Sequence, residues 1–174
     1  MGKIVKIASV LALSSICIFA QAAPKNKIAP KELTVQVKKL GELLSDGYAV
    51  AYTPATFTYE IKRKDTSKLV LTVFTIEGFG GGNNHSQFLA IFEENLNEQN
   101  KPYYTYLDNI GIGGKGWRGV EELNAKVIED KKNNALNISF DALEVGEDDA
   151  PNFPSKKVIV KVVYSKGKLT EVTK

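Results

Sequence analysis

Alternation of apolar and polar residues with a period of two is the feature that most limits what this chain can fold into. Phe57, Tyr59 and Ile61 alternate with polar residues up to Arg63. Successive side chains of a strand point to opposite faces, so this pattern predicts a half-buried strand. Residues 69–76 are apolar on both faces, as in a central strand covered on two sides. Further strands are predicted over residues 48–53, 87–92, 103–110, 136–140, 157–164 and 169–172.

One segment before these strands has a helical period instead. Its apolar residues recur at steps of four, three and four, which places them on one stripe of a helix over residues 31–45: Leu33, Val37, Leu40 and Leu44. Pro30 suits the first turn, and Asp46-Gly47 is expected to supply a left-handed stop. A strand over residues 34–38 is the alternative, because Val35 and Val37 alternate with polar residues.

The stretch from Val120 to Ile128 fits either a helix or a strand, and we favour a strand that forms a hairpin with residues 136–140 through the turn at 131–134. The whole pattern predicts a mainly β fold with one N-terminal helix (α+β). We expect an antiparallel meander of about seven or eight strands, closed as a barrel or stacked as a sandwich. Residues 31–174 are expected to form a single β-rich domain.

The N-terminus has the pattern of a secretory signal peptide. Lys3 and Lys6 precede an apolar run over residues 7–20, and Ala20-Gln21-Ala22 supplies small residues for cleavage. The run is too short to span a bilayer. We therefore expect residues 1–22 to be a signal peptide, residues 23–30 a flexible lead, and the processed protein to be periplasmic or secreted without a membrane span.

Charge and cysteine content narrow the possible partners. Two of the 23 basic residues belong to the signal peptide and 20 residues are acidic, so the processed chain is close to neutral. Nucleic-acid binding is not expected, since it needs a marked excess of Lys and Arg.

Cys17 is the only cysteine and follows the bulky Ile16, which argues against a lipid anchor. Cleavage would leave no thiol for disulfides or metal binding.

A glycine-rich connection carries the only histidine. Residues 80–82 are all glycine, and Asn83 and His85 follow between two predicted strands. This composition suits a hairpin loop with positive φ angles, or else a mobile binding loop. One His without Cys is too small a ligand set for zinc, so no metal site is expected. Ser86 is not expected to pair with His85, because neighbours on a strand point to opposite faces.

A second glycine-rich run, residues 111–116, has the GxGxxG spacing of dinucleotide-binding folds. That motif needs a following helix whose N-terminus receives the pyrophosphate, within a βαβ unit that this chain lacks. We therefore expect a structural glycine loop and no cofactor.

Aromatic and basic residues flank this second run. Before it stand Tyr103, Tyr104 and Tyr106; within and after it stand Lys115, Trp117 and Arg118. Large amphipathic rings beside cationic side chains are typical of recognition surfaces. Tyr104 and Tyr106 share one strand face, and core packing is the alternative interpretation for some of these rings.

Acidic residues crowd the segment ahead of Pro151: Asp141, Glu144, Glu147, Asp148 and Asp149. Their spacing does not follow the alternating ligands and glycine of a calcium-binding loop, so a solvated acidic loop is expected.

Four segments together resemble a family of uncharacterised exported bacterial β-rich proteins, some of them lipoproteins. The segments are residues 74–83, 87–92, 113–118 and 149–155. Members of that family tend to carry a cysteine pair before a Pro-Ser step, and here Asn152 and Phe153 occupy those places before Pro154-Ser155. The resemblance implies a β-rich exported domain and transfers no catalytic residue.

No catalytic constellation emerges from these motifs, so the sequence favours a non-enzymatic domain that binds a small ligand or an envelope protein. The candidate binding residues are Asn83, His85, Tyr104, Tyr106, Lys115, Trp117 and Arg118. The alternative is a hydrolase that uses carboxylates or a serine on envelope material, with His85 as the only histidine that can act as a base near neutral pH.

Overall fold

The computed structural model describes residues 29–63 and 68–173. The expected signal peptide over residues 1–22 and most of the lead over residues 23–30 lie outside this range. One helix, α1 (Lys31–Leu44), precedes nine strands: β1 (Val50–Lys62), β2 (Lys68–Glu77), β3 (His85–Leu96), β4 (Pro102–Gly114), β5 (Arg118–Gly119), β6 (Lys126–Asp130), β7 (Ala135–Glu144), β8 (Lys156–Ser165) and β9 (Lys168–Glu171). The prediction of a mainly β fold with one N-terminal helix is confirmed.

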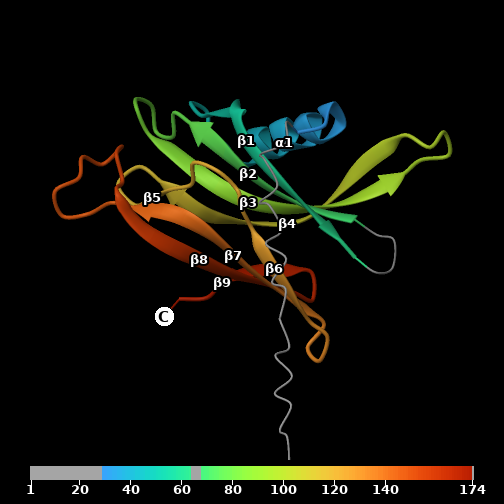
Figure 1. Ribbon diagram of the computed structural model, residues 1–174. Helices are drawn as coiled ribbons and strands as arrows, with labels where there is room; N and C mark the ends of the chain where they lie inside the picture. Colours follow the sequence, from blue (N-terminus) through green and yellow to red (C-terminus); the bar gives the residue numbers. More distant parts are fainter. Residues whose placement is uncertain (1–28, 64–67, 174) are drawn as a thin grey trace, which may run out of the picture.

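All nine strands belong to one antiparallel sheet in the order β1-β2-β3-β4-β5-β7-β8-β9, with β6 also paired to β7. The sheet is not closed, so the barrel alternative is not supported. Strand β9 approaches β4, but through a side chain: the Leu169 N–H donates to Oδ2 of Asp108 at 2.7 Å. The sheet bends so that its first and last halves face each other below the helix (Figure 1).

The helix lies on the outer face of the first half of the sheet. Leu33, Val37 and Leu40 are buried there against Phe74 and Phe92, as the helical period predicted. The predicted left-handed stop at Gly47 is wrong, because Ser45 ends the helix in an extended conformation. The Ser45 hydroxyl donates to the Gly41 carbonyl at 2.6 Å and satisfies one of the last helical acceptors.

The inner face holds a larger core shared by the two halves of the sheet. Leu71, Val73 and Leu89 from the first half pack with Ile138 and Val160 from the second. All of β2 from Leu69 to Ile76 is buried, as predicted for a strand covered on both faces. No helix among the described residues is long and apolar enough to cross a bilayer.

The ambiguous stretch after the second glycine run is a strand only in part. Residues 126–130 form β6 and pair with β7 across the predicted turn. Residues 120–125 are outside the ladders, so the strand prediction is wrong for them. They leave the strand because Val120, Leu123 and Ala125 turn into the inner core.

Candidate functional site

The two loops at one end of the sheet form a single unit, which we call the loop end: the turn over residues 114–117 and the loop over residues 145–155. Two backbone hydrogen bonds join them. The Gly116 N–H donates to the Pro151 carbonyl at 2.8 Å, and the Val145 N–H donates to the Trp117 carbonyl at 3.0 Å. The loop end lies at the left of the molecule in Figure 1.

The carboxylate of Asp149 fixes the longer loop. It accepts hydrogen bonds from the Gly146 N–H, the Ser155 N–H and the Ser155 hydroxyl at 2.7, 2.7 and 2.8 Å. The Gly146 N–H and the Ser155 hydroxyl stabilise the charged form and lower the pKa of Asp149. The segment over residues 146–155 therefore forms an internally bonded loop.

Two aromatic side chains protrude from the loop end. Trp117 is 44% exposed and Phe153 is 75% exposed, and the Lys115 side chain is exposed beside them on the turn. The Trp117 carbonyl accepts the Val145 N–H, and the Phe153 N–H donates to the Ala150 carbonyl at 2.8 Å, so hydrogen bonds hold the backbone at both rings. Phe153 was not among the predicted binding residues, although a large apolar residue between Asn152 and Pro154 was a visible signal in the sequence.

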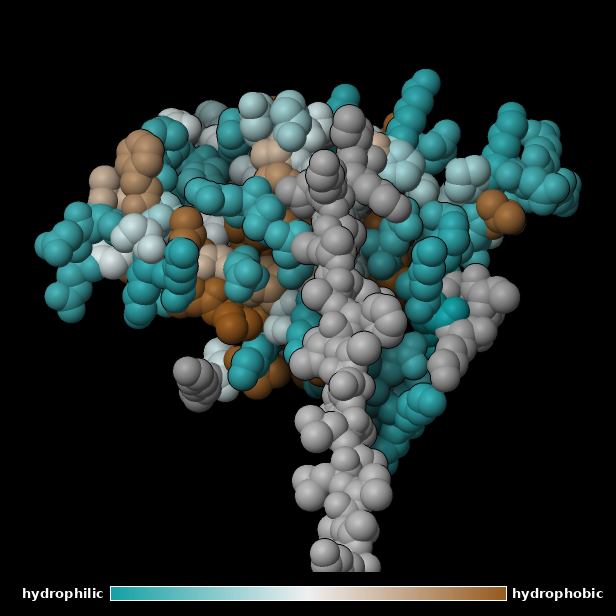
Figure 2. Space-filling view, viewed as in Figure 1, coloured by the Kyte–Doolittle hydropathy of each residue, from teal (hydrophilic) through white to brown (hydrophobic). Residues whose placement is uncertain are grey.

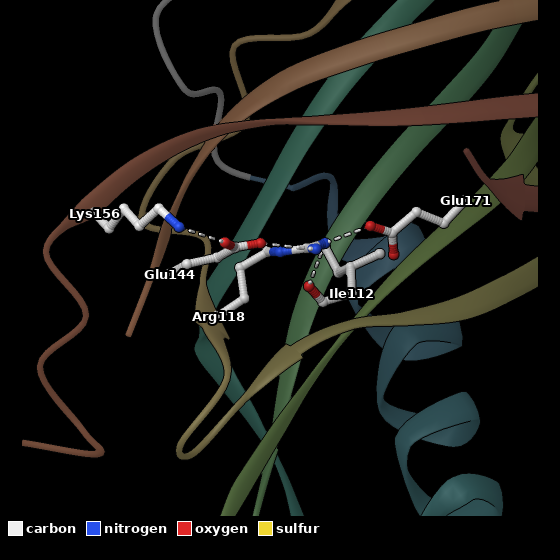
Figure 3. Close-up of polar contacts among 5 residues, drawn as sticks. All are labelled: Ile112, Arg118, Glu144, Lys156 and Glu171. Carbon is white, nitrogen blue, oxygen red and sulfur yellow. Dashed lines mark hydrogen bonds and ion pairs between the residues drawn. The ribbon is translucent and has the colours of Figure 1, made fainter. Parts of the chain in front are cut away.

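Arg118 is a buried residue that anchors the shorter turn of the loop end. It is only 8% exposed. Nη1 donates to Oε1 of Glu171 at 2.8 Å and to the Ile112 carbonyl at 3.3 Å, and Nη2 donates to Oε1 of Glu144 at 3.3 Å (Figure 3). Lys156 lies 3.9 Å from the other oxygen of Glu144. The guanidinium therefore ties β4, β5, β7 and β9 together.

Trp117 is stacked on this anchor. The guanidinium carbon of Arg118 lies 4.8 Å from the centroid of the Trp117 ring, within the range of a cation–π contact. The exposed Trp117 ring therefore contacts the buried side chain that pairs with Glu144 and Glu171. The sequence grouped Trp117 and Arg118 as candidate binding residues, and the structure stacks them. Glu144 and Glu171 are distant in sequence, and no local pattern pointed to them.

His85 borders the loop end, since the Lys115 N–H donates to its backbone carbonyl at 3.1 Å. Asn83 is exposed on the adjacent glycine loop. Residues Gly80, Gly81 and Gly82 have positive φ, as the hairpin interpretation predicted. Asp46 holds this loop by accepting the Gly80 N–H at 2.7 Å, and that bond and the one from the Tyr48 N–H lower its pKa.

Tyr104 and Tyr106 are separate from this surface. The β3–β4 ladder pairs Tyr104 with Glu94 at one end and Gly114 with Ser86 at the other. Tyr104 is buried in the core under α1, and its hydroxyl donates to Glu94 at 3.1 Å. Burial, together with the Glu94 charge, raises its pKa to about 12. The structure therefore does not bring these two tyrosines to Trp117.

The remaining motifs have structural explanations. The second glycine run is the end of β4 and its turn, and no helix follows it in the described residues. A Cβ on Gly113 would lie 2.5 Å from the Arg118 carbonyl oxygen, so close strand approach requires glycine there. No group of three or more His, Cys, Asp or Glu side chains in the described part of the chain is placed to hold a metal ion.

Comparison of the chain with protein-family models, with curated proteins and with solved structures finds no match. The arguments about function therefore rest on the geometry of the loop end and of the surfaces beside it.

Proposed function

We propose that this chain is an exported, non-enzymatic binding domain that recognises a protein partner of the cell envelope through its loop end. The observation that carries the proposal is the pair of exposed rings, Trp117 and Phe153, on two loops joined by backbone hydrogen bonds. Aromatic anchors dominate the energetics of protein interfaces because they bury a large area with few rotatable bonds.

Rigidity supports binding over a merely structural role for this surface. An anchor that is already ordered loses little conformational entropy when a partner covers it. The Asp149 hydrogen bonds order the longer loop, and the Arg118 ion pairs order the shorter turn. Because the rings protrude from loops, a protein surface suits them better than a small ligand does. The export signal that the sequence predicts over residues 1–22 supports a partner outside the cytoplasm.

Site-specific photo-crosslinking in the producing cell tests this proposal. A photo-reactive phenylalanine analogue replaces Phe153, and the same analogue replaces Ile128, which is exposed on β6 away from the loop end. We expect one discrete protein adduct from position 153, absent from position 128 and lost when Trp117→Ala is added. The proposal is overturned by equal adducts at both positions, or by no adduct from a normally folded protein.

Arg118 is not substituted in this test. Its burial and ion pairs mean that Arg118→Ala would disturb the fold as well as the surface. Phe153→Ser is the cleaner second variant, because its exposed side chain can be removed with little effect on the free energy of unfolding. The melting temperature of each variant is the control for folding.

A further inference from the structure

We propose that this protein forms a two-fold symmetric dimer by pairing the free edge of β1 with the same edge of a second copy, at a surface separate from the loop end. Strand β1 is the first strand of the sheet and, within the described residues, is paired with β2 alone (Figure 1). An unpaired edge presents backbone donors and acceptors to another chain, and natural proteins protect such edges with charges, prolines or bulges.

The start of β1 lacks the protection that charge provides. Residues 47–59 contain no charged residue, although a quarter of the chain is charged. Figure 2 shows long hydrophilic side chains around much of the outline of the molecule, and none of the charged ones belongs to this range. Pro54 and a register shift between Tyr52 and Phe57 interrupt the ladder with β2. Pairing is therefore limited to a short segment around Val50, before the proline.

The hydrogen bonds of the neighbouring strands show which residues of this segment face the open edge. The Lys115 N–H donates to the His85 carbonyl, so His85 turns its backbone groups to β4 and away from β2. Its register partner on β2, Glu77, therefore turns its own groups toward β1, where it pairs with Val50. Since backbone direction alternates along a strand, Ala51 directs its N–H and its carbonyl to the open edge.

An antiparallel register centred on Val50 fits these groups. It places Ala51 of each copy opposite Ala49 of the other. The Ala49 N–H already donates to Oδ1 of Asp46 at 2.9 Å, so the bond across the edge runs from the Ala51 N–H to the Ala49 carbonyl. Two-fold symmetry makes this bond twice. A register centred on Ala49 would oppose two N–H groups that are already used.

The same register leaves room for both helices. Helix α1 rests on β1 at Ala51, where only a glycine at position 41 leaves space for the Ala51 Cβ. With the centre on Val50, the two copies of Ala51 are two positions apart along the strands, which with the spacing between strands gives about 8 Å. Packed helices lie about 8–10 Å apart, so the two helices can pass each other. A centre on Ala51 would place both helices over the same point.

Large apolar side chains are exposed along this edge. Tyr48 is 75%, Val50 64% and Tyr52 44% exposed, and Leu43, on the last turn of α1, is 82% exposed. The register pairs Val50 with Val50 and places Tyr48 of each copy opposite Tyr52 of the other. Pairs of β-branched and of aromatic residues are favourable across neighbouring strands, and no charge opposes a like charge. The edge is thus complementary to itself.

The exposed area predicts a weak dimer. At about 200 Å² for a complete aromatic side chain, the exposed parts of Tyr48 and Tyr52 amount to about 240 Å² per copy and about 480 Å² in the dimer. Stable complexes bury at least about 1,200 Å² in total. Leu43, Val50 and the paired backbone supply the remaining area, so the interface is close to this lower limit. We therefore expect a dissociation constant roughly in the micromolar range.

Disulfide cross-linking tests the register. Each variant also carries Cys17→Ser, so that the introduced thiol is the only one. With Val50→Cys the two thiols face each other at the Cα separation of a disulfide, and we expect a covalent dimer under mild oxidation. Tyr52→Cys sets the thiols four positions apart, about 13 Å along the strands, and should give no covalent dimer. Ile159→Cys is the matched control, since Ile159 is as exposed as Val50.

Charge substitutions test the dimer without a disulfide, with self-association measured by sedimentation equilibrium. Val50→Lys places two like charges opposite each other and should weaken association at least about ten-fold, whereas Ile159→Lys should leave it unchanged. A mixture of Val50→Lys and Val50→Glu should associate again, because opposite charges then face each other, and a folding defect would not be rescued in this way. Phe153→Ser should also leave association unchanged, so the dimer and the loop end can fail independently.

Three results would overturn the proposal. The first is a normally folded protein that stays monomeric even at millimolar concentration. The second is a covalent dimer that forms no faster from Val50→Cys than from Ile159→Cys or Tyr52→Cys, which would exclude the register. The third is self-association that Val50→Lys leaves unchanged, which would mean that the copies meet at another surface. Circular dichroism of each variant controls for folding.

Discussion

The side-chain amide of Gln87 makes hydrogen bonds to both backbone groups of Val120. Oε1 accepts the Val120 N–H at 2.7 Å, and Nε2 donates to the Val120 carbonyl at 3.0 Å. Gln87 thereby replaces a neighbouring strand at the point where the chain leaves β5. Both residues are buried, so these backbone groups have no solvent to replace the amide.

Gln87→Leu is expected to lower the free energy of unfolding by about 2–3 kcal/mol, because it leaves two buried backbone groups without partners. Urea denaturation measures this. Thr75→Val is the matched control, since it removes only the 3.4 Å contact from Gln87 Nε2 to the Thr75 hydroxyl. A loss for Gln87→Leu no larger than that for Thr75→Val would contradict the capping role of the amide.

Gly113 and Gly111 are expected to respond differently to alanine. A Cβ on Gly113 would lie 2.5 Å from the Arg118 carbonyl oxygen, whereas a Cβ on Gly111 would meet no atom within 4 Å. Gly113→Ala should therefore cost about 1–3 kcal/mol, as overpacking does. Gly111→Ala should be neutral or stabilising, because glycine weakens a strand. Thermal denaturation compares the two, and equal melting temperatures would refute the close-approach argument.

Arg118→Met is expected to cost about 3 kcal/mol, because it leaves two partly buried carboxylates without their cation. Glu144 and Glu171 retain some solvent contact, which limits the loss. Lys156→Met is the control: the Lys156 side chain is well exposed and its pair spans 3.9 Å, so a change within about 0.5 kcal/mol is expected. Chemical denaturation at neutral pH gives both values.

Asp149 is expected to make the free energy of unfolding depend on pH in the acidic range. Its pKa is lowered in the folded protein by the Gly146 N–H and the Ser155 hydroxyl. The stabilisation is therefore complete above the ordinary value of 3.8 and is lost as the pH falls through the lowered pKa. Below pH 3.8, the midpoint of urea denaturation should decrease less steeply with falling pH in Asp149→Asn than in the unchanged protein. Asp148→Asn, at an exposed neighbour, should keep the steep fall, and identical acid slopes for the two variants would exclude this role for Asp149.

Local patterns predicted those helices and strands whose conformation follows from the apolar period of their own residues. The helix was predicted because Leu33, Val37 and Leu40 are on one stripe, and β2 because both of its faces are apolar. The stretch from Val120 was misread as strand up to its sixth residue. There Val120, Leu123 and Ala125 turn into the inner core, and the Gln87 amide, far away in sequence, bonds to the backbone of Val120 in place of a strand. Periodicity carries no information about such a partner.

The candidate site was predictable to the extent that its residues are neighbours in the chain. Trp117 and Arg118 were recognised together, and the structure stacks them. Tyr104 and Tyr106 were grouped with them by closeness in sequence, but an extended strand moves residues apart by about 3.3 Å per position. The partners of Arg118 come from β7 and β9, and only the sheet topology brings them there.

Complete burial of β2 between α1 and the inner core has a consequence for hydrogen exchange. Its amides can contact solvent only when the helix detaches and the two halves of the sheet also separate. In heavy water we therefore expect the amide protons of β2 to exchange last. The helix touches the outer face alone, and its release would leave the inner core intact. Hydrogen exchange should therefore resolve two opening reactions. The first is release of α1 alone, and the second also separates the two halves of the sheet and exposes the amides of β2.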